Sequence, residues 1–242
     1  MKQDFIKLHH TLTQVNWRII CLFYTTVLIG TFLARKLPNL LQIVAAQFTE
    51  VHLPWNMNHG IAVLLVSFVF YKIAYNKQSA INFFGTNRIK SILFPIVLLL
   101  GYGIYGIKND QGINEHIWAI VFCLFTLVYD IMEEYNWRGF LTENLTPLHF
   151  VVKAIISGIF WAVWHILIFE NFDQFGGFTI FLTLCIVFSI LLTYSVTKTK
   201  SLLVPSTIHA LFIKTNIVTL TCLIFYMLIL ITWDKKTILG KN

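Results

Sequence analysis

The stretch DIMEEYNWR, residues 130–138, follows an apolar run, residues 117–128, and places four charged side chains at its end. Ionisable groups at membrane depth cost roughly 3 kcal/mol each on insertion scales, so they are generally paired, turned toward a water-filled cavity or functional. This charged stretch at the end of a hydrophobic segment is therefore the first candidate for chemistry in the chain.

The composition indicates that the apolar run is one of several membrane spans. Hydrophobic residues make up 57% of the 242 residues and charged residues only 12%, and the mean hydropathy is +0.73. Such a chain is too apolar for a soluble domain of this size. We predict an all-α, polytopic transmembrane bundle of about eight (7–8) helices, forming a single domain over residues 1–242.

The predicted spans are apolar runs that approach the roughly 20 residues needed to cross a bilayer. They cover residues 18–34, 61–75, 89–106, 117–131, 151–169, 178–196, 202–213 and 216–233. The seventh run is short for a span, which makes it a candidate for a re-entrant or broken helix. For the charged stretch to lie in the bundle, the fourth span has to extend past Arg138.

Basic side chains predict the orientation of these spans. Four clusters of Lys and Arg precede the first run, separate the second from the third, follow the sixth and end the chain, and eight spans put all four on one side. The positive-inside rule makes that side cytoplasmic, although Arg35, Lys36 and Lys108 oppose this orientation. We expect a multi-pass protein of the cell membrane with both termini cytoplasmic. Basic residues beside anionic lipid account for the net charge of +7, so no nucleic-acid partner is predicted.

Helix geometry separates the two adjacent glutamates. Glu134 and Arg138 are four residues apart, hence on one face and able to form an ion pair. Glu133 points about 100° away, toward Asp130 and apolar side chains, a neighbourhood typical of a general base. The alternative, from the spacing alone, is that both acids form a structural ion-pair cluster or cap a helix end at the surface.

Two histidines on later runs could join this site. His165 lies in the fifth run and His209 in the seventh, and each is the single histidine of its run. A lone histidine on an apolar helix is more often an interhelical hydrogen-bonding group than a catalyst. Three helices that each bring one titratable side chain inward are nevertheless the arrangement of a site buried in a bundle. The remaining histidines are expected to be exposed: His9, His10, His52, His59, His116 and His149.

These motifs resemble a known family of membrane proteases. The stretch EEYNWRGFL, residues 133–141, resembles the EExxxR-G-x-L signature of the CPBP family, the CAAX proteases and bacteriocin-processing enzymes also called ABI proteins. The stretch WAVWH, residues 161–165, resembles the FxxxH motif with Trp161 in the Phe position, and His209 matches the later His. The resemblance runs from about Tyr129 to Asn216, within a motif core of residues 117–216.

The resemblance implies an intramembrane endopeptidase with defined roles for these residues. Glu133 would be the base that activates water, His165 its partner and His209 an oxyanion donor. Glu134 and Arg138 would be the structural pair. The implied substrate is a small or membrane-associated peptide or protein, and the bacterial members are linked to bacteriocin processing, self-immunity and peptide signalling.

One departure from the family pattern leaves a second function open. The position of the expected Asn, one turn after His209, holds Ile213. Asn216 could substitute only if the chain breaks near Lys214, and Trp161 is a further supporting candidate. The alternative function is therefore a catalytically weak or inactive relative that acts as a membrane-bound immunity or regulatory binding protein.

The sequence also allows a zinc site. One Glu and two His, here Glu133, His165 and His209, form the ligand set of some catalytic zinc sites. The HExxH motif is missing, and the three ligands would have to converge from three helices. We expect a metal-free glutamate mechanism without a cofactor, and zinc is the alternative.

Overall fold

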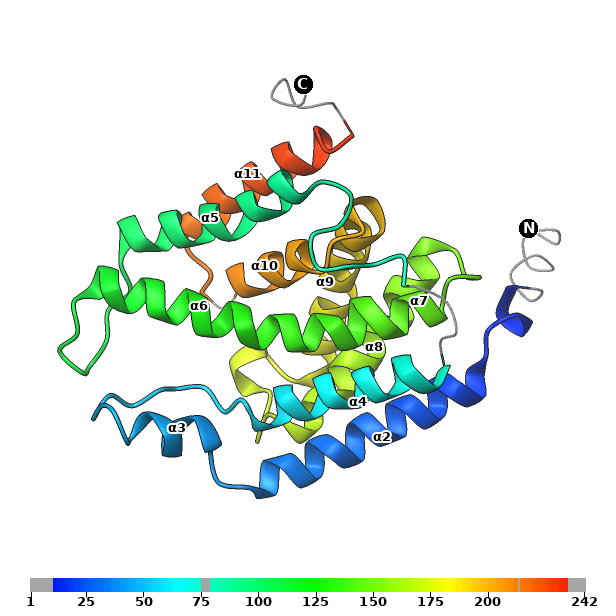
Figure 1. Ribbon diagram of the computed structural model, residues 1–242, viewed down its shortest axis with the longest axis horizontal. Helices are drawn as coiled ribbons and strands as arrows, with labels where there is room; N and C mark the ends of the chain where they lie inside the picture. The colour runs from blue at the N-terminus through cyan, green and yellow to red at the C-terminus, as the bar shows by residue number, and fades with distance from the viewer. Residues whose placement is uncertain (1–10, 75–78, 213, 235–242) are drawn as a thin grey trace.

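The fold is an assembly of helices, seen in a computed structural model that describes residues 11–74, 79–212 and 214–234 (Figure 1). Over these residues no β-strand forms, and a single isolated bridge joins Asn82 to Ser201. The prediction of an all-α helical bundle is confirmed.

Helices occupy each of the eight predicted runs. The first half contains α2 (Trp17–Lys36), α3 (Leu40–Ala45), α4 (Asn58–Ala74), α5 (Arg88–Tyr105) and α6 (Glu115–Glu134). A π-helix, η1 (Tyr135–Leu141), continues α6 into α7 (Thr142–Asn144). The second half contains α8 (Phe150–Trp164), the short η2 (His165–Leu167) and η3 (Asp173–Phe175), α9 (Phe178–Thr199), α10 (Leu203–Leu211) and α11 (Ile217–Ile231).

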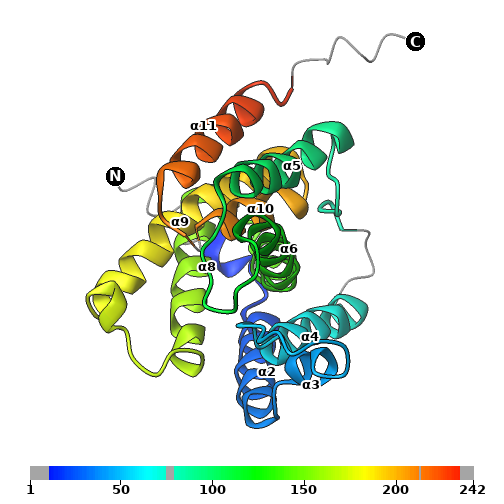
Figure 2. The same cartoon turned by 90° about the vertical axis from the view of Figure 1, so that its left-hand side faces the viewer.

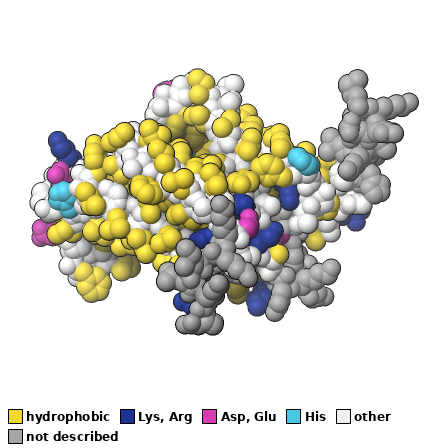
Figure 3. All heavy atoms as spheres, turned by 90° about the horizontal axis from the view of Figure 1, so that it is seen from above, with side chains coloured by type: hydrophobic (Ala, Val, Ile, Leu, Met, Phe, Trp, Pro, Cys, Tyr) yellow, Lys and Arg dark blue, Asp and Glu magenta, His cyan; other side chains and the backbone are white. Residues whose placement is uncertain are grey.

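Five helices are long and apolar enough to cross a membrane: residues 17–36, 88–105, 115–144, 150–167 and 178–199. Two shorter apolar helices, residues 58–73 and 217–231, accompany them. The nine residues of α10 rise only about 14 Å, well short of a bilayer core. Large apolar side chains such as Ile104 are widely exposed, as expected of a lipid-facing surface, and hydrophobic side chains cover most of the face in Figure 3.

Helix α6 lies at the centre of the assembly. Viewed nearly along its axis in Figure 2, α6 has α2 and α4 on one side, α5 and α10 on the other, and α8 beside it. One hydrophobic core joins α5, α6, α10 and α11, and a second joins α2, α4, η1, α8 and α9. The Asn114 side chain caps the start of α6 by accepting the backbone N–H groups of His116 and Ile117.

A glycine sets the distance between α8 and α9. A Cβ atom on Gly158 would lie 2.7 Å from Cα of Ile186, so only glycine permits this backbone approach. Because α8 carries Trp161 and is followed directly by His165, the contact fixes the position of both side chains relative to the bundle.

Candidate active site

The glutamate pair lies where the α-helix changes into a π-helix. Glu134 ends α6, and η1 contains Arg138 within one continuous span of residues 115–144. The span therefore extends past Arg138, as the site requires. Single π-turns within α-helices occur frequently at functional sites.

Glu134 and Arg138 form a buried ion pair. Nη1 of Arg138 lies 2.9 Å from Oε1 of Glu134, and both side chains are 0% exposed. The predicted i, i+4 contact is thus present and lies inside the protein rather than at its surface. Three polar atoms of this pair, Oε2 of Glu134 and both Nε and Nη2 of Arg138, have no hydrogen-bond partner among the residues that the structure describes.

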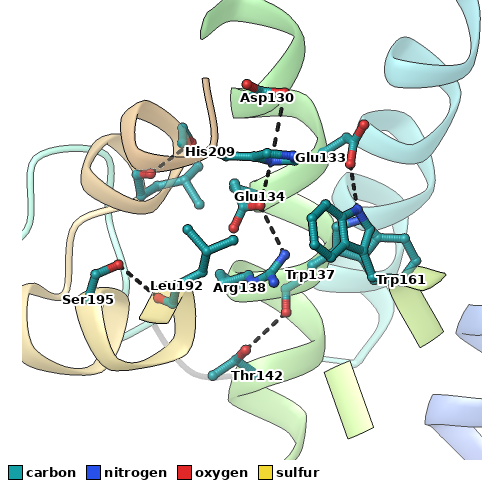
Figure 4. Close-up of polar contacts among 12 residues, drawn as sticks. Asp130, Glu133, Glu134, Trp137, Arg138, Thr142, Trp161, Leu192, Ser195 and His209 are labelled. Carbon is teal, nitrogen blue, oxygen red and sulfur yellow. Dashed lines mark hydrogen bonds and ion pairs between the residues drawn. The ribbon is translucent and has the colours of Figure 1, made fainter. Parts of the chain in front are cut away.

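His209 contacts the glutamate of this pair and a second acid. Its Nδ1 lies 3.0 Å from Oε1 of Glu134 and 3.7 Å from Oδ1 of Asp130. Figure 4 shows the imidazole between the two carboxylates. Sequence reasoning treated Asp130 only as a neighbour of Glu133, whereas the structure places it beside His209. His209, the later His of the family pattern, therefore contacts the EExxxR motif through Glu134.

Glu133 points away from this cluster, toward α8. Nε1 of Trp161 donates a hydrogen bond of 2.9 Å to Oε2 of Glu133, which is only 2% exposed (Figure 4). The two adjacent glutamates therefore have separate surroundings: one pairs with a cation, and the other accepts a neutral donor. This separation agrees with the division of faces predicted from helix geometry.

The indole of Trp161 is in contact with most of the candidate site. Its ring lies 5.0 Å from the guanidinium carbon of Arg138. The ring centroid lies 4.9 Å from that of His209 and 5.2 Å from that of His165, both edge-on. A phenylalanine could make these ring contacts, but it could not donate the hydrogen bond to Glu133.

His165 follows α8 and is held by its own turn. Its Nδ1 lies 2.8 Å from the carbonyl oxygen of Trp161, which can only accept, so Nδ1 carries the proton. This tautomer leaves Nε2 with a lone pair. Phe169 and Phe181 pack on the ring, each with a centroid 5.1 Å away. Among the described contacts, Trp161 links His165 to Glu133, and no hydrogen bond joins the two directly.

Asn216 is engaged in capping a helix. The chain does break between α10 and α11, but the Asn216 side chain accepts the backbone N–H groups of Val218 and Thr219 at the start of α11. Its side-chain oxygen therefore has a structural partner. Ile213, at the position of the family Asn, lies outside the described residues.

The acidic and histidine side chains do not form a metal-binding group. Within residues 11–74, 79–212 and 214–234, no three His, Cys, Asp or Glu side chains are arranged to hold a metal ion. Glu133 faces an indole, while His209 faces two other carboxylates. The alternative zinc set of Glu133, His165 and His209 does not fit this geometry.

Sequence reasoning missed one histidine beside the site. His59 was expected to be exposed, and this was wrong: it is only 5% exposed, in the first turn of α4. Its Nε2 lies 2.6 Å from the hydroxyl of Tyr129, one turn before Glu133. The adjacent Gly60 is a sequence signal for close helix packing that could have indicated a buried position.

Two cavities lie beside α6 and η1, the helices that carry the glutamate pair and Arg138. One, of about 490 Å³, lies beside Ile131, Tyr135 and Gly139 and includes Lys72. The other, of about 550 Å³, is lined by apolar side chains of α3, α4 and α6 and reaches Met132. Both cavities are lined by residues adjacent in sequence to the glutamate pair, so each is a candidate approach for a substrate.

Residues 115–213 match the family model described as type II CAAX prenyl endopeptidase Rce1-like. This stretch is thus similar to the CAAX protease family. The CAAX protease match covers α6 to α10, from the glutamate pair through Trp161 and His165 to His209. No curated protein and no solved structure gave a match. The match covers 99 of the 242 residues and supports a CAAX-type membrane protease in general terms, with a peptide or protein substrate.

Proposed function

We propose that this protein is a glutamate intramembrane endopeptidase in which Glu133 activates the attacking water. The observation that carries the proposal is the 2.9 Å contact between the buried Glu133 carboxylate and the Trp161 indole, in a helix that also contains a separate Glu134–Arg138 ion pair. Glu133 is not neutralised by that arginine, so it is available as a base.

Glu133 and His165 would act together on the water. Glu133 takes one proton from water, and the resulting hydroxide attacks the carbonyl carbon of the scissile peptide bond. The Nε2 lone pair of His165 orients the water, because Nδ1–H is already committed to the carbonyl of Trp161. Glu133 then returns the proton to the departing amine, which balances the reaction.

His209 would stabilise the oxyanion. Its Nδ1 contacts Glu134, which leaves Nε2 to face a substrate. Neighbouring carboxylates of Asp130 and Glu134 favour the charged imidazole, in which Nε2 also carries a proton to donate. A preorganised donor in a dry site is more effective than the same donor in water.

The alternative function is a weak or inactive relative that binds a peptide for immunity or regulation. Ile213 favours it, because removal of one oxyanion donor typically costs about 10²- to 10³-fold in kcat. Asn216 offers no evident replacement, since its side chain caps α11. We favour the protease because Glu133, His165 and His209 each contact Trp161, which supports a shared site.

The mechanism is proposed to need no metal. If zinc were required, chelator would abolish cleavage and zinc would restore it. Retained cleavage in chelator would support water activation by the glutamate alone.

The physiological role would be cleavage of a small or membrane-associated peptide or protein, in bacteriocin processing, self-immunity or peptide signalling. The protein would lie in the cell membrane with both termini in the cytoplasm, as the basic clusters predict. Lipid would then surround the protein, and membrane-associated substrates would reach it from the bilayer.

The test is cleavage of a panel of small secreted peptide precursors by purified protein in nanodiscs. Wild type is expected to cleave at least one precursor, and the Glu133→Gln variant none. Binding of precursors without cleavage by either protein would favour the immunity or regulatory function. Equal cleavage by both proteins would overturn the role of Glu133.

A further inference from the structure

A buried hydrogen bond links α4 to the helix that carries Glu133. His59, 5% exposed, has Nε2 at 2.6 Å from the Tyr129 hydroxyl, and the two rings meet edge-on with centroids 5.3 Å apart. Tyr129 precedes Glu133 by four residues and therefore lies on the same face of α6. The Tyr129 hydroxyl is also a side-chain hydrogen-bond partner of Glu133.

The donor and acceptor groups of His59, Tyr129 and Glu133 fix the direction of the hydrogen bonds between them. An ionised carboxylate only accepts, so the single proton of the Tyr129 hydroxyl is donated to Glu133. The hydroxyl oxygen then has to accept from Nε2–H of His59, which defines the tautomer of that ring. Nδ1 of His59 is left without a hydrogen-bond partner in the described part of the chain. Burial of such an atom is costly, which argues that the ring is held for its contact with Tyr129.

Local packing supports the same contact. A Cβ atom on Gly60 would lie 3.2 Å from two ring carbons of Tyr129 and 3.5 Å from Met132. The glycine therefore allows α4 to approach α6 closely at the residue next to His59. Trp164 also packs near His59, with the ring centroids 5.9 Å apart and the ring planes tilted by 47°.

We propose that His59 and Tyr129 are positioning residues for Glu133. The carboxylate of Glu133 is held by the hydroxyl of Tyr129, on α6, and by the indole of Trp161, on α8. The hydroxyl of Tyr129 is in turn held by His59, on α4. This inference rests on the proposed role of Glu133 as the base. It adds α4, which lies outside the matched residues 115–213, to the machinery of the site.

A kinetic experiment compares four variants on any cleaved precursor. Tyr129→Phe and His59→Leu are each expected to lower kcat about tenfold with KM unchanged. The double variant is expected to lower kcat no further, because both substitutions interrupt the same chain of hydrogen bonds. His59→Gln keeps an N–H donor and is expected to restore most of kcat. The matched control is Tyr226→Phe, which removes another buried hydroxyl, one that donates to the carbonyl of Phe94 between α11 and α5, with kcat per folded molecule unchanged. Additive losses, or no rescue by Gln, would overturn the proposal.

A second measurement needs no substrate. The infrared carboxyl bands of ¹³C-glutamate-labelled protein are assigned to Glu133 by their loss in Glu133→Gln. We expect these bands to shift in Tyr129→Phe and in His59→Leu, and to remain in place in His59→Gln and Tyr226→Phe. Unshifted bands in Tyr129→Phe would refute the positioning role. Shifted bands together with full cleavage by Glu133→Gln would retain the hydrogen-bond chain and refute the proposed function instead.

Discussion

The indole nitrogen of Trp161 donates a 2.9 Å hydrogen bond to the carboxylate of Glu133, and this bond joins α8 to α6 at the candidate site. The family motif has Phe at this position, so the donor is a property of this chain. It gives Glu133 a neutral partner while Arg138 remains with Glu134.

The Trp161→Phe variant tests the value of this donor. Phenylalanine keeps the ring contacts with His165 and His209 but removes the N–H group. A hydrogen bond to a charged group is worth roughly 1.5–3 kcal/mol, so kcat is expected to fall about 10- to 100-fold. Steady-state kinetics on a cleaved precursor provides the measurement.

Trp164→Phe is the matched control for this prediction. Trp164 is also buried and also donates its indole N–H, but to the Thr31 hydroxyl at 2.7 Å. This variant is expected to lose stability while its kcat per folded molecule stays near that of the wild type. Equal losses of kcat in both variants would mean that the indole of Trp161 acts only by packing.

Arg138→Leu is expected to destabilise the fold. Breaking a fully buried ion pair leaves Glu134 uncompensated, which typically costs about 3–5 kcal/mol in the free energy of unfolding. Denaturant unfolding in detergent micelles measures this change. Lys198→Leu, which breaks the more exposed pair with Asp234, serves as the control and should change stability little. Similar effects of the two substitutions would contradict the structural role of Arg138.

Gly158→Ala is expected to push α8 away from α9. The added Cβ would lie 2.7 Å from a backbone atom of Ile186, and overpacking of this kind costs about 1–3 kcal/mol. Gly30→Ala is the control, because its Cβ would make an ordinary 3.5 Å contact with Val66. Unfolding measurements should show Gly30→Ala as neutral or stabilising, and a neutral Gly158→Ala would disprove the close approach.

Ile213→Asn is expected to raise activity. If the wild type lacks one oxyanion donor, an added amide donor could recover up to about 10²-fold in kcat. The measurement is kcat with a saturating precursor, compared with Ile213→Leu, which adds no donor. An increase in both variants, or in neither, would argue against a missing donor.

Much of the fold follows from local sequence patterns. Apolar runs predicted the eight longest helices, because hydrophobic length is a strong signal, whereas the short α3 and α7 lie outside these runs. The i, i+4 spacing likewise predicted the contact between Glu134 and Arg138. Each of these features depends on residues close together in the chain.

Contacts between distant helices could not be predicted in the same way. The bond from Trp161 to Glu133 and the bond from His59 to Tyr129 depend on how α4, α6 and α8 pack together. The expected exposure of His59 failed because its position at the start of a run resembled a helix end at the surface. Packing at Gly60, rather than hydropathy, buries it.

The most direct test of the central claim compares Glu133→Gln with Glu134→Gln in one cleavage and unfolding experiment. Glu133→Gln is predicted to fold normally and to lose about 10²- to 10⁴-fold in kcat, the usual contribution of a general base. Glu134→Gln is predicted to lose stability first, because it weakens the pair with Arg138. Wild-type cleavage by a folded Glu133→Gln protein would contradict the account.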